Sequence, residues 1–315
     1  MALCLFWLLF DNLVNNEIYF GMSFWFFGRN KAGTEKRLFR HKKLKIGLAL
    51  GGGGARGVAH IGVLKAFEEL GLEFDYVAGT SAGAVVGSLY SAGLTSLQIR
   101  DLALSLRTKD IKTSKLFFRP SKASSIADIL KNVFGHDAQF YELRKPFVAV
   151  AVDLVCGNEK DLCEGSVASC VAGSCAVPGV FAPVVYEGMH LVDGGLKNNV
   201  PADVVRNMGA DVVVAVDVNH KRGSGTSSTK LFNVIGSTIG VLMRDVVRAK
   251  LAFADIVLEP DVTKYPSTKL QNVDDMIKIG YDSVMNALPE LSKLVSSKLS
   301  PRKKRKWKRK IQESM

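Results

Sequence analysis

Three short segments of this chain contain residue types that acyl-transfer chemistry needs, and the first supplies a nucleophile. Residues 79–83 read GTSAG, which is a GxSxG motif. The small residues beside Ser81 allow a tight turn between a strand and a helix, and such a turn exposes the serine hydroxyl at its apex. Because a serine hydroxyl is a weak nucleophile at neutral pH, Ser81 also needs a neighbouring base.

The second segment is a run of glycines at residues 51–57, GGGGARG. Glycines let the backbone turn sharply and bring its N–H groups close to a ligand. The helix expected after the run adds the partial positive charge of its N-terminus. The run therefore predicts an anion cradle, for a phosphate or for the oxyanion of a tetrahedral intermediate. It is not a P-loop, because no GK[ST] follows, and it is not a clean dinucleotide-binding turn.

The third segment, residues 188–201, reads GMHLVDGGLKNNVP and offers a base. Asp193 ends a short apolar run, and Gly194 and Gly195 after it permit a sharp turn and the close approach of another chain segment. An ordinary Asp-Gly turn is the alternative interpretation. Among the five histidines, His220 has the placement that best suits a triad, because it follows an apolar strand.

Together these segments resemble the patatin-like phospholipases. The matching motifs are GGGGARG, GTSAG and DGG, and residues 174–184, SCAVPGVFAPV, are similar to a proline-containing segment of that family. The run GGGGARGVAHIGVLKAFEELG is similar to the bacterial branch related to neuropathy target esterase. The resemblance extends over about residues 45–260, with a helical continuation to about residue 296.

The resemblance implies a Ser–Asp dyad that releases a fatty acid from a phospholipid, a lysophospholipid or a neutral lipid ester. Ser81 would attack the ester carbonyl, and Asp193 would accept its proton and later activate water. It implies no cofactor, no metal and no calcium requirement. The implied oxyanion hole consists of Gly52, Gly53 and Gly54, with help from Arg56. The motif glycines that support these groups are Gly51, Gly57, Gly79, Gly83, Gly194 and Gly195.

Two other functions stay open at this point. One is an α/β-hydrolase with a Ser81–Asp193–His220 triad, whose order along the chain fits that fold. The serine turn comes only about 30 residues after the first predicted strand, however, and an α/β-hydrolase places several strands before it. The other is a non-catalytic lipid-binding regulatory protein on the same fold, because a fold does not fix a function.

Strand and helix patterns alternate along the body of the chain, which predicts a mostly parallel sheet with helices on both faces, a three-layer α/β/α fold. Residues 105–145 have weak periodicity and are expected to form a surface insertion or a mobile cap. Pro289 marks a potential break in the last helix. The expected strands are 45–50, 74–78, 147–152, 211–218 and 254–258, and the expected helices are 58–70, 82–91, 231–251 and 273–294.

The composition is that of a globular protein. The 315 residues are 47% hydrophobic and 23% charged, which excludes a disordered chain, a collagen-like chain and a disulfide scaffold. None of the five cysteines has CxxC spacing, so we expect reduced thiols and no metal site.

The net charge of +12 is confined to flanking segments. Residues 29–45 and 302–315 each carry +7, residues 1–28 carry −2, and residues 46–301 are neutral. We therefore expect an aromatic and basic extension at 1–44, a catalytic domain at 45–262, a helical part at 263–300 and a basic tail at 301–315. Anionic membrane is the expected partner of the basic segments, with Trp307 favouring it over nucleic acid, for which no module is visible.

The apolar run at residues 2–10 is too short for a membrane span, which needs about 20 residues, and no basic residue precedes it as in a signal peptide. It packs on the body, lies in a membrane interface, or extends upstream of a start at Met22. We expect a cytoplasmic or peripherally membrane-bound protein.

Overall fold

The structure is a computed structural model that describes residues 44–108, 124–220 and 244–298, together with Arg305, Trp307 and Arg309. The expected N-terminal extension and the other residues of the basic tail lie outside the described residues. So do residues 231–243 of one expected helix and 109–123 of the expected insertion.

A central eight-stranded sheet organises the chain, with strand order β5-β6-β3-β2-β1-β7-β8 and β4 also paired to β3. The pairs that join β3, β2, β1, β7 and β8 are parallel. The pairs of β4, β6 and β5 are antiparallel and lie at one edge. The strands are β1 (Ile46–Leu50), β2 (Tyr76–Thr80), β3 (Phe147–Asp153), β4 (Asn158–Leu162), β5 (Val184–Tyr186), β6 (Met189–Asp193), β7 (Val212–Val216) and β8 (Ile256–Leu258). The predicted mostly parallel sheet is confirmed.

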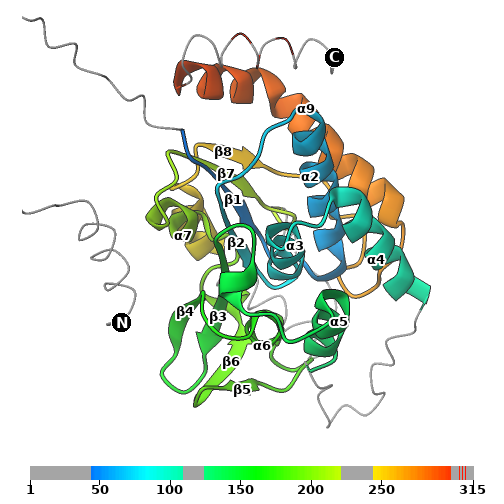
Figure 1. Cartoon of the computed structure of the whole chain (residues 1–315), viewed down its shortest axis with the longest axis vertical. Coiled ribbons are helices and arrows are strands. Elements are labelled where there is room, and N and C mark those ends of the chain that lie inside the picture. Colours follow the sequence, from blue (N-terminus) through cyan, green and yellow to red (C-terminus); the bar gives the residue numbers. More distant parts are fainter. Residues whose placement is uncertain are drawn as a thin grey trace, which may run out of the picture. The chain divides into compact units, whose positions relative to one another are not determined.

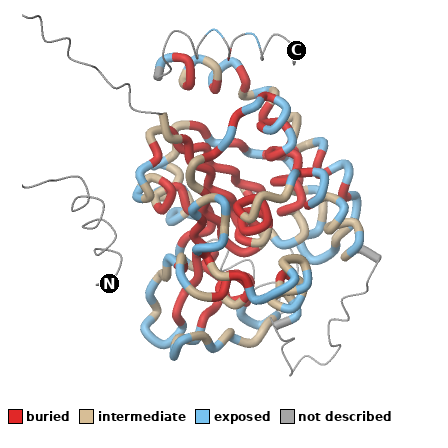
Figure 2. Tube along the Cα trace, in the orientation of Figure 1, coloured by how far each residue is buried: buried red, intermediate tan, exposed pale blue. Residues whose placement is uncertain are grey.

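Helices cover both faces of this sheet (Figure 1). Alternate residues of β1 and β7 belong to two separate hydrophobic cores: Leu48 and Val214 face one core, and Ala49 and Val213 face the other. The first core includes α2, α3 and α9, and the second includes α7. Figure 2 shows the sheet as the most buried part of the trace. The helices are η1 (Gly54–Val58), α2 (Ala59–Glu69), α3 (Ala82–Ser91), α4 (Ser96–Thr108), α5 (Ser124–Phe134), η2 (Phe140–Glu142), α6 (Val167–Ser174), η3 (Gly194–Leu196), α7 (Ala202–Asn207) and α9 (Val273–Lys298); residues 244–251 are also helical.

Strand β2 begins two residues later than the sequence pattern suggests. Phe74 was expected in this strand, but its ring packs edge-on against Phe67 of α2 with centroids 4.9 Å apart. The backbone joins the sheet only after Asp75, whose N–H donates to the Ile46 carbonyl. This shift carries the strand to Thr80, directly before Ser81.

Helix α9 runs without interruption through Pro289, so the potential break there is wrong. An internal proline costs roughly 3 kcal/mol. Buried side chains on both sides of the proline, Leu288 and Leu291, join the same core as Val284 and Val295. Their packing favours a continuous helix over a break.

Helices α2 and α9 approach each other through glycine. A Cβ added to Gly62 would lie 1.8 Å from the Ile277 carbonyl oxygen, and one added to Gly280 would lie 1.9 Å from the Ala59 carbonyl oxygen. Such distances leave no room for a side chain. The two glycines therefore set the spacing between a helix that follows the glycine run and the last long helix described.

Trp307 in the basic tail is buried against the main core. Only 7% of its surface is exposed. The expectation that this indole favours membrane contact is therefore wrong for Trp307, whereas Arg305 and Arg309 are exposed.

We expect Gly62→Ala to destabilise the protein by about 2–3 kcal/mol, because overpacking forces two backbones apart. Urea unfolding measures the change. Lys65→Ala on the exposed face of the same helix is the matched control and should unfold like the wild type. Equal stability of both variants would show that the helices can separate at no cost.

Candidate active site

Ser81 occupies a strained turn between β2 and α3. Its φ of 54° lies in the left-handed region, which costs a non-glycine residue about 1–3 kcal/mol. The Ser81 N–H donates to Ser174 Oγ at 2.9 Å, and that hydroxyl donates to the Val150 carbonyl at 2.5 Å. The serine thus stands at the N-terminus of α3, with its backbone fixed by a side chain from α6.

The turn exists only because small residues surround it. A Cβ on Gly83 would lie 2.1 Å from the Leu50 carbonyl oxygen, and one on Gly79 would lie 2.4 Å from the Gly83 carbonyl oxygen. A Cβ on Gly57 would lie 2.5 Å from the Ala82 Cβ. Through these contacts Leu50, at the end of β1, and Gly57, in η1, lie directly against the serine turn.

Asp193 ends β6 and lies across β3 from the serine. In the sheet register Thr80 pairs with Val150, and the next residue of β3, Ala151, pairs with Asp193. Ser81 and Asp193 therefore leave the sheet at the same level, and their backbones lie two strand spacings, or roughly 10 Å, apart across the sheet. The structure thus brings the two predicted groups to one edge of the sheet.

The Asp193 carboxylate is oriented by the turn that follows it. Its Oδ1 accepts the Gly195 N–H at 2.7 Å, and the Asp193 N–H donates to the Ala176 carbonyl. Gly194 cannot be replaced without a clash, because a Cβ there would lie 2.1 Å from the Val150 carbonyl oxygen. Gly195 therefore binds the Asp193 carboxylate through its N–H, and Gly194 leaves room for the Val150 backbone of β3.

Cys175 lies beside both groups and was missed by the sequence analysis. Burial, and then the charge of Asp193, raises the pKa of its thiol, while a hydrogen bond with the Ser81 side chain acts in the opposite direction. The thiol therefore stays protonated. Its position in SCAVPG, the fourth matching segment, was the available signal.

Backbone hydrogen bonds fix the first two residues of the glycine run. The Gly51 N–H donates to the Val216 carbonyl and the Gly52 N–H to the Asn199 carbonyl, each at 3.0 Å. A Cβ on Gly52 would lie 3.2 Å from the Ser81 Cβ, so the run lies against the serine. Within the described part of the chain, the N–H groups of Gly53 and Gly54 have no hydrogen-bond acceptor. These two N–H groups are therefore candidate donors for an anion, whereas the N–H of Gly52, expected to be a third donor, already binds the Asn199 carbonyl.

The Arg56 guanidinium donates hydrogen bonds to three acceptors within the protein. Its Nε donates to the Tyr265 carbonyl at 2.8 Å and its Nη2 to the Thr263 carbonyl at 3.0 Å. Its Nη1 donates to Asn219 Oδ1 at 3.1 Å. These contacts favour positioning of the loop over direct contact with an oxyanion.

His60 binds the backbone carbonyl of Gly51, the first glycine of the run. Its ring is fully buried, and its Nε2 lies 2.7 Å from the Gly51 carbonyl oxygen. Burial lowers the pKa of His60 to about 4, so the ring is neutral and Nε2–H donates. The sequence pattern gave no sign of this role, because the acceptor is a backbone atom.

His220, the alternative base, lacks one contact of a triad histidine among the described residues. A triad uses Nδ1 for the carboxylate and Nε2 for the serine. The Nδ1 of His220 is buried and has no hydrogen-bond partner among the residues that the structure describes. This arrangement disfavours the triad.

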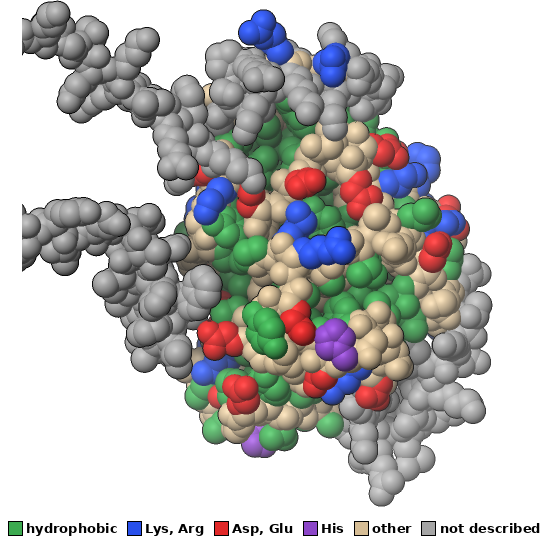
Figure 3. Space-filling model, in the orientation of Figure 1, with side chains coloured by type: hydrophobic (Ala, Val, Ile, Leu, Met, Phe, Trp, Pro, Cys, Tyr) green, Lys and Arg blue, Asp and Glu red, His purple; other side chains and the backbone are tan. Residues whose placement is uncertain are grey.

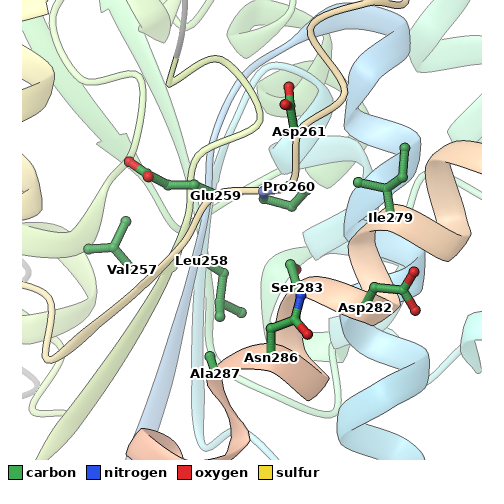
Figure 4. A pocket seen from close by; sticks show the side chains of 10 residues that line it. All are labelled: Val257, Leu258, Glu259, Pro260, Asp261, Ile279, Asp282, Ser283, Asn286 and Ala287. Atoms are coloured by element: carbon green, nitrogen blue, oxygen red, sulfur yellow. The ribbon is translucent and has the colours of Figure 1, made fainter.

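A surface pocket of about 460 Å³ lies elsewhere, between the end of β8 and α9 (Figure 4). Glu259, Asp261 and Asp282 line it, and Ser81 and Asp193 do not.

Charged side chains of both signs are scattered over the face in Figure 3. In the described ranges, no group of His, Cys, Asp or Glu could hold a metal ion.

A family model described as patatin-like phospholipase matches residues 48–206, which include the glycine run, the serine turn and Asp193. Patatin-like phospholipase domain-containing protein 7 of Rattus norvegicus is 30% identical over 274 residues, covering 75% of this chain and 20% of the relative. An uncharacterised NTE family protein of Mycobacterium bovis is 35% identical over 182 residues, covering 56% of this chain and 49% of the relative. The chain thus spans about a fifth of the first relative and half of the second.

Among solved structures, VipD from Legionella pneumophila is similar, with a TM-score of 0.48 and 14% identity. The match covers 78% of this chain and 67% of that one.

His60→Gln tests the buried imidazole through pH. Between the ordinary pKa of 6.5 and the folded value of about 4, the unfolded chain binds a proton that the folded chain does not. Stability therefore falls as pH falls through this window, by up to about 1.4 kcal/mol per pH unit from this residue. Urea unfolding from pH 4.5 to 7.5 should give a flatter dependence for His60→Gln than for the wild type.

The control is His190→Gln, because His190 is exposed on β6. It should keep the wild-type pH dependence. Parallel curves for all three proteins would refute a buried neutral His60.

Proposed function

The chain belongs to the patatin-like phospholipase family, and from that premise we propose that it is a lipid acyl hydrolase with a Ser81–Asp193 dyad. The substrate is a fatty acyl ester of a phospholipid, a lysophospholipid or a neutral lipid. One observation carries the proposal: Ser81 is held in a strained turn against a loop with two unoccupied N–H donors, at the level of Asp193 across β3.

In the proposed reaction, Ser81 Oγ attacks the ester carbonyl carbon while its proton passes to the Asp193 carboxylate. The oxyanion accepts hydrogen bonds from the Gly53 and Gly54 N–H groups. Collapse of the intermediate breaks the ester bond, and the proton moves from Asp193 to the departing alcohol. Asp193 then takes a proton from water, which attacks the acyl-serine carbonyl. The bond to Ser81 Oγ breaks, the proton returns from Asp193 to Ser81 Oγ, and the fatty acid is released.

A carboxylate is a weak base for an alcohol, since its ordinary pKa is about 4. The proton transfer becomes feasible when the oxyanion is stabilised in the same step, and loss of a single donor costs about 3–4 kcal/mol in such sites. The burial of Ser81 and Asp193 supports this coupling, because few waters compete for the charges there.

We expect Ser81→Ala and Asp193→Asn each to lower turnover at least about a thousandfold, since each removes a member of one catalytic unit. The assay is release of fatty acid from a short-chain and a long-chain ester with EDTA present. Ser88→Ala is the matched control. That serine is buried on α3 and its Oγ donates to the Val85 carbonyl, so its loss should leave turnover unchanged.

His220→Ala separates the dyad from the triad. Full activity in this variant excludes a triad, whereas activity retained in Asp193→Asn and lost in His220→Ala would establish His220 as the base. A wild-type chain that neither hydrolyses esters nor reacts with a fluorophosphonate would favour the lipid-binding regulatory protein.

We further propose that a lipid surface is reached through the segment that follows Cys175. Val177 and Val180 are 39% and 36% exposed there. The segment adjoins the candidate site, because the Asp193 N–H donates to Ala176. No helix among the described residues has the length and apolarity to cross a membrane. The exposed side chains of Val177 and Val180 are the contact that we propose.

The variant Val177→Asp/Val180→Asp should lose most of its turnover on long-chain phospholipid packed in anionic vesicles. It should keep turnover on a soluble short-chain ester, because the dyad is untouched. Val257→Asp, at a residue 38% exposed on β8, is the control and should act like the wild type on both substrates. Equal loss on both substrates would mean that the valines support the fold instead.

A further inference from the structure

The carbonyl between Gly52 and Gly53 is bound by two buried side-chain amides. Asn219 Nδ2 donates to the Gly52 oxygen at 2.7 Å, and Asn199 Nδ2 donates to the same oxygen at 3.3 Å. Both asparagines are almost fully buried. A carbonyl oxygen has two lone pairs, so this one has its full set of hydrogen bonds.

Binding that carbonyl also directs the N–H at the other end of the same peptide. A trans peptide is planar, and its C=O and N–H point in opposite directions. The Gly53 N–H therefore points away from both asparagines. The preceding N–H, on Gly52, is fixed as well by the Asn199 carbonyl. The Gly52–Gly53 peptide cannot rotate without breaking both hydrogen bonds to its carbonyl, so the two asparagines fix the orientation of the donor proposed for the oxyanion.

Asn219 is itself held in one orientation by Arg56. The Asn219 Oδ1 accepts from Arg56 Nη1 at 3.1 Å, and a guanidinium can only donate. The amide oxygen must therefore face Arg56, which leaves Nδ2 to face Gly52. The Asn219 N–H donates to Asp217 Oδ1 at 2.8 Å and fixes the backbone of the same residue.

We propose that Asn219 is a positioning residue for the oxyanion hole, and that it keeps the Gly53 N–H directed into the site. This inference rests on the proposed hydrolase function. Asn219 lies outside the segment that the family model matches, which ends at residue 206. It acts through the Gly52 carbonyl and has no contact with substrate in this role.

Asn219→Asp is the sharpest test, because it changes the amide to a carboxylate of nearly the same shape. A carboxylate still accepts from Arg56 but cannot donate to the Gly52 oxygen. It repels that oxygen and accepts an N–H instead, so the Gly52–Gly53 peptide should turn over and direct Gly53 toward residue 219. We expect kcat for a short-chain ester to fall about 100-fold with KM unchanged, the usual effect of losing one oxyanion donor.

Asn219→Ala should lose less kcat than Asn219→Asp, because Asn199 still donates and no charge repels the carbonyl. Val284→Ala on α9 is the control for stability, since it makes a buried cavity far along the sequence from the site. Its kcat should equal that of the wild type even where its thermal stability is lower. A loss of kcat in Asn219→Asp that only follows thermal stability would overturn the proposal.

Crystal structures of the wild type and of Asn219→Asp test the orientation without any assay. A reversed peptide in the variant supports the proposal, and an unchanged peptide overturns it. If the wild type hydrolyses no ester, the proposed function fails, and the peptide orientation alone then decides whether Asn219 directs the Gly53 N–H.

Discussion

The close approach of backbone to backbone where β1 and β2 end is the constraint on which this structure depends. Gly83 lies against the Leu50 carbonyl, Gly57 against Ala82, and Gly52 against Ser81. A methyl added at Gly83 or Gly57 would force these segments apart, and one added at Gly52 would crowd Ser81. The parallel pairing of β1 with β2 brings the two loops to one edge, and the absence of side chains lets them touch.

Around this contact, the remaining anchors come from distant segments. Thr80 Oγ1 donates to the Asn198 carbonyl, and so connects the serine turn to the loop after Asp193. Asn198 in turn donates from its Nδ2 to Glu159 and Asp203. The loop that follows Asp193 is thus fixed to the strand that precedes Ser81 and to the antiparallel part of the sheet, which keeps Asp193 and Ser81 at one level.

The sequence predicts much of this because its strongest signals are local. Buried parallel strands such as β1 and β7 are continuous apolar runs, and the motifs predict Ser81 and Asp193 as candidate site residues. The sequence did not predict β4, because its residues NEKDL have almost no apolar pattern and the strand lies at the antiparallel side of the sheet. It did not predict α6 either, because that helix is buried on nearly all sides and no 3.6-residue period marks one face. The roles of His60 and Asn219 could not be predicted, because each binds a backbone carbonyl and no motif encodes that partner.

The acceptors of Arg56 have a consequence for the growing chain. The Thr263 and Tyr265 carbonyls lie 207 and 209 residues after the arginine in the sequence, and contacts of such separation form late. During synthesis the glycine run and the serine therefore emerge long before the residues that hold them in place. A ribosome-bound fragment that ends before residue 263 lacks both carbonyls, so its Arg56 guanidinium lacks two of the acceptors that it has in the folded chain. The Arg56 side chain is in this way fixed only after residues 263–265 have been synthesised.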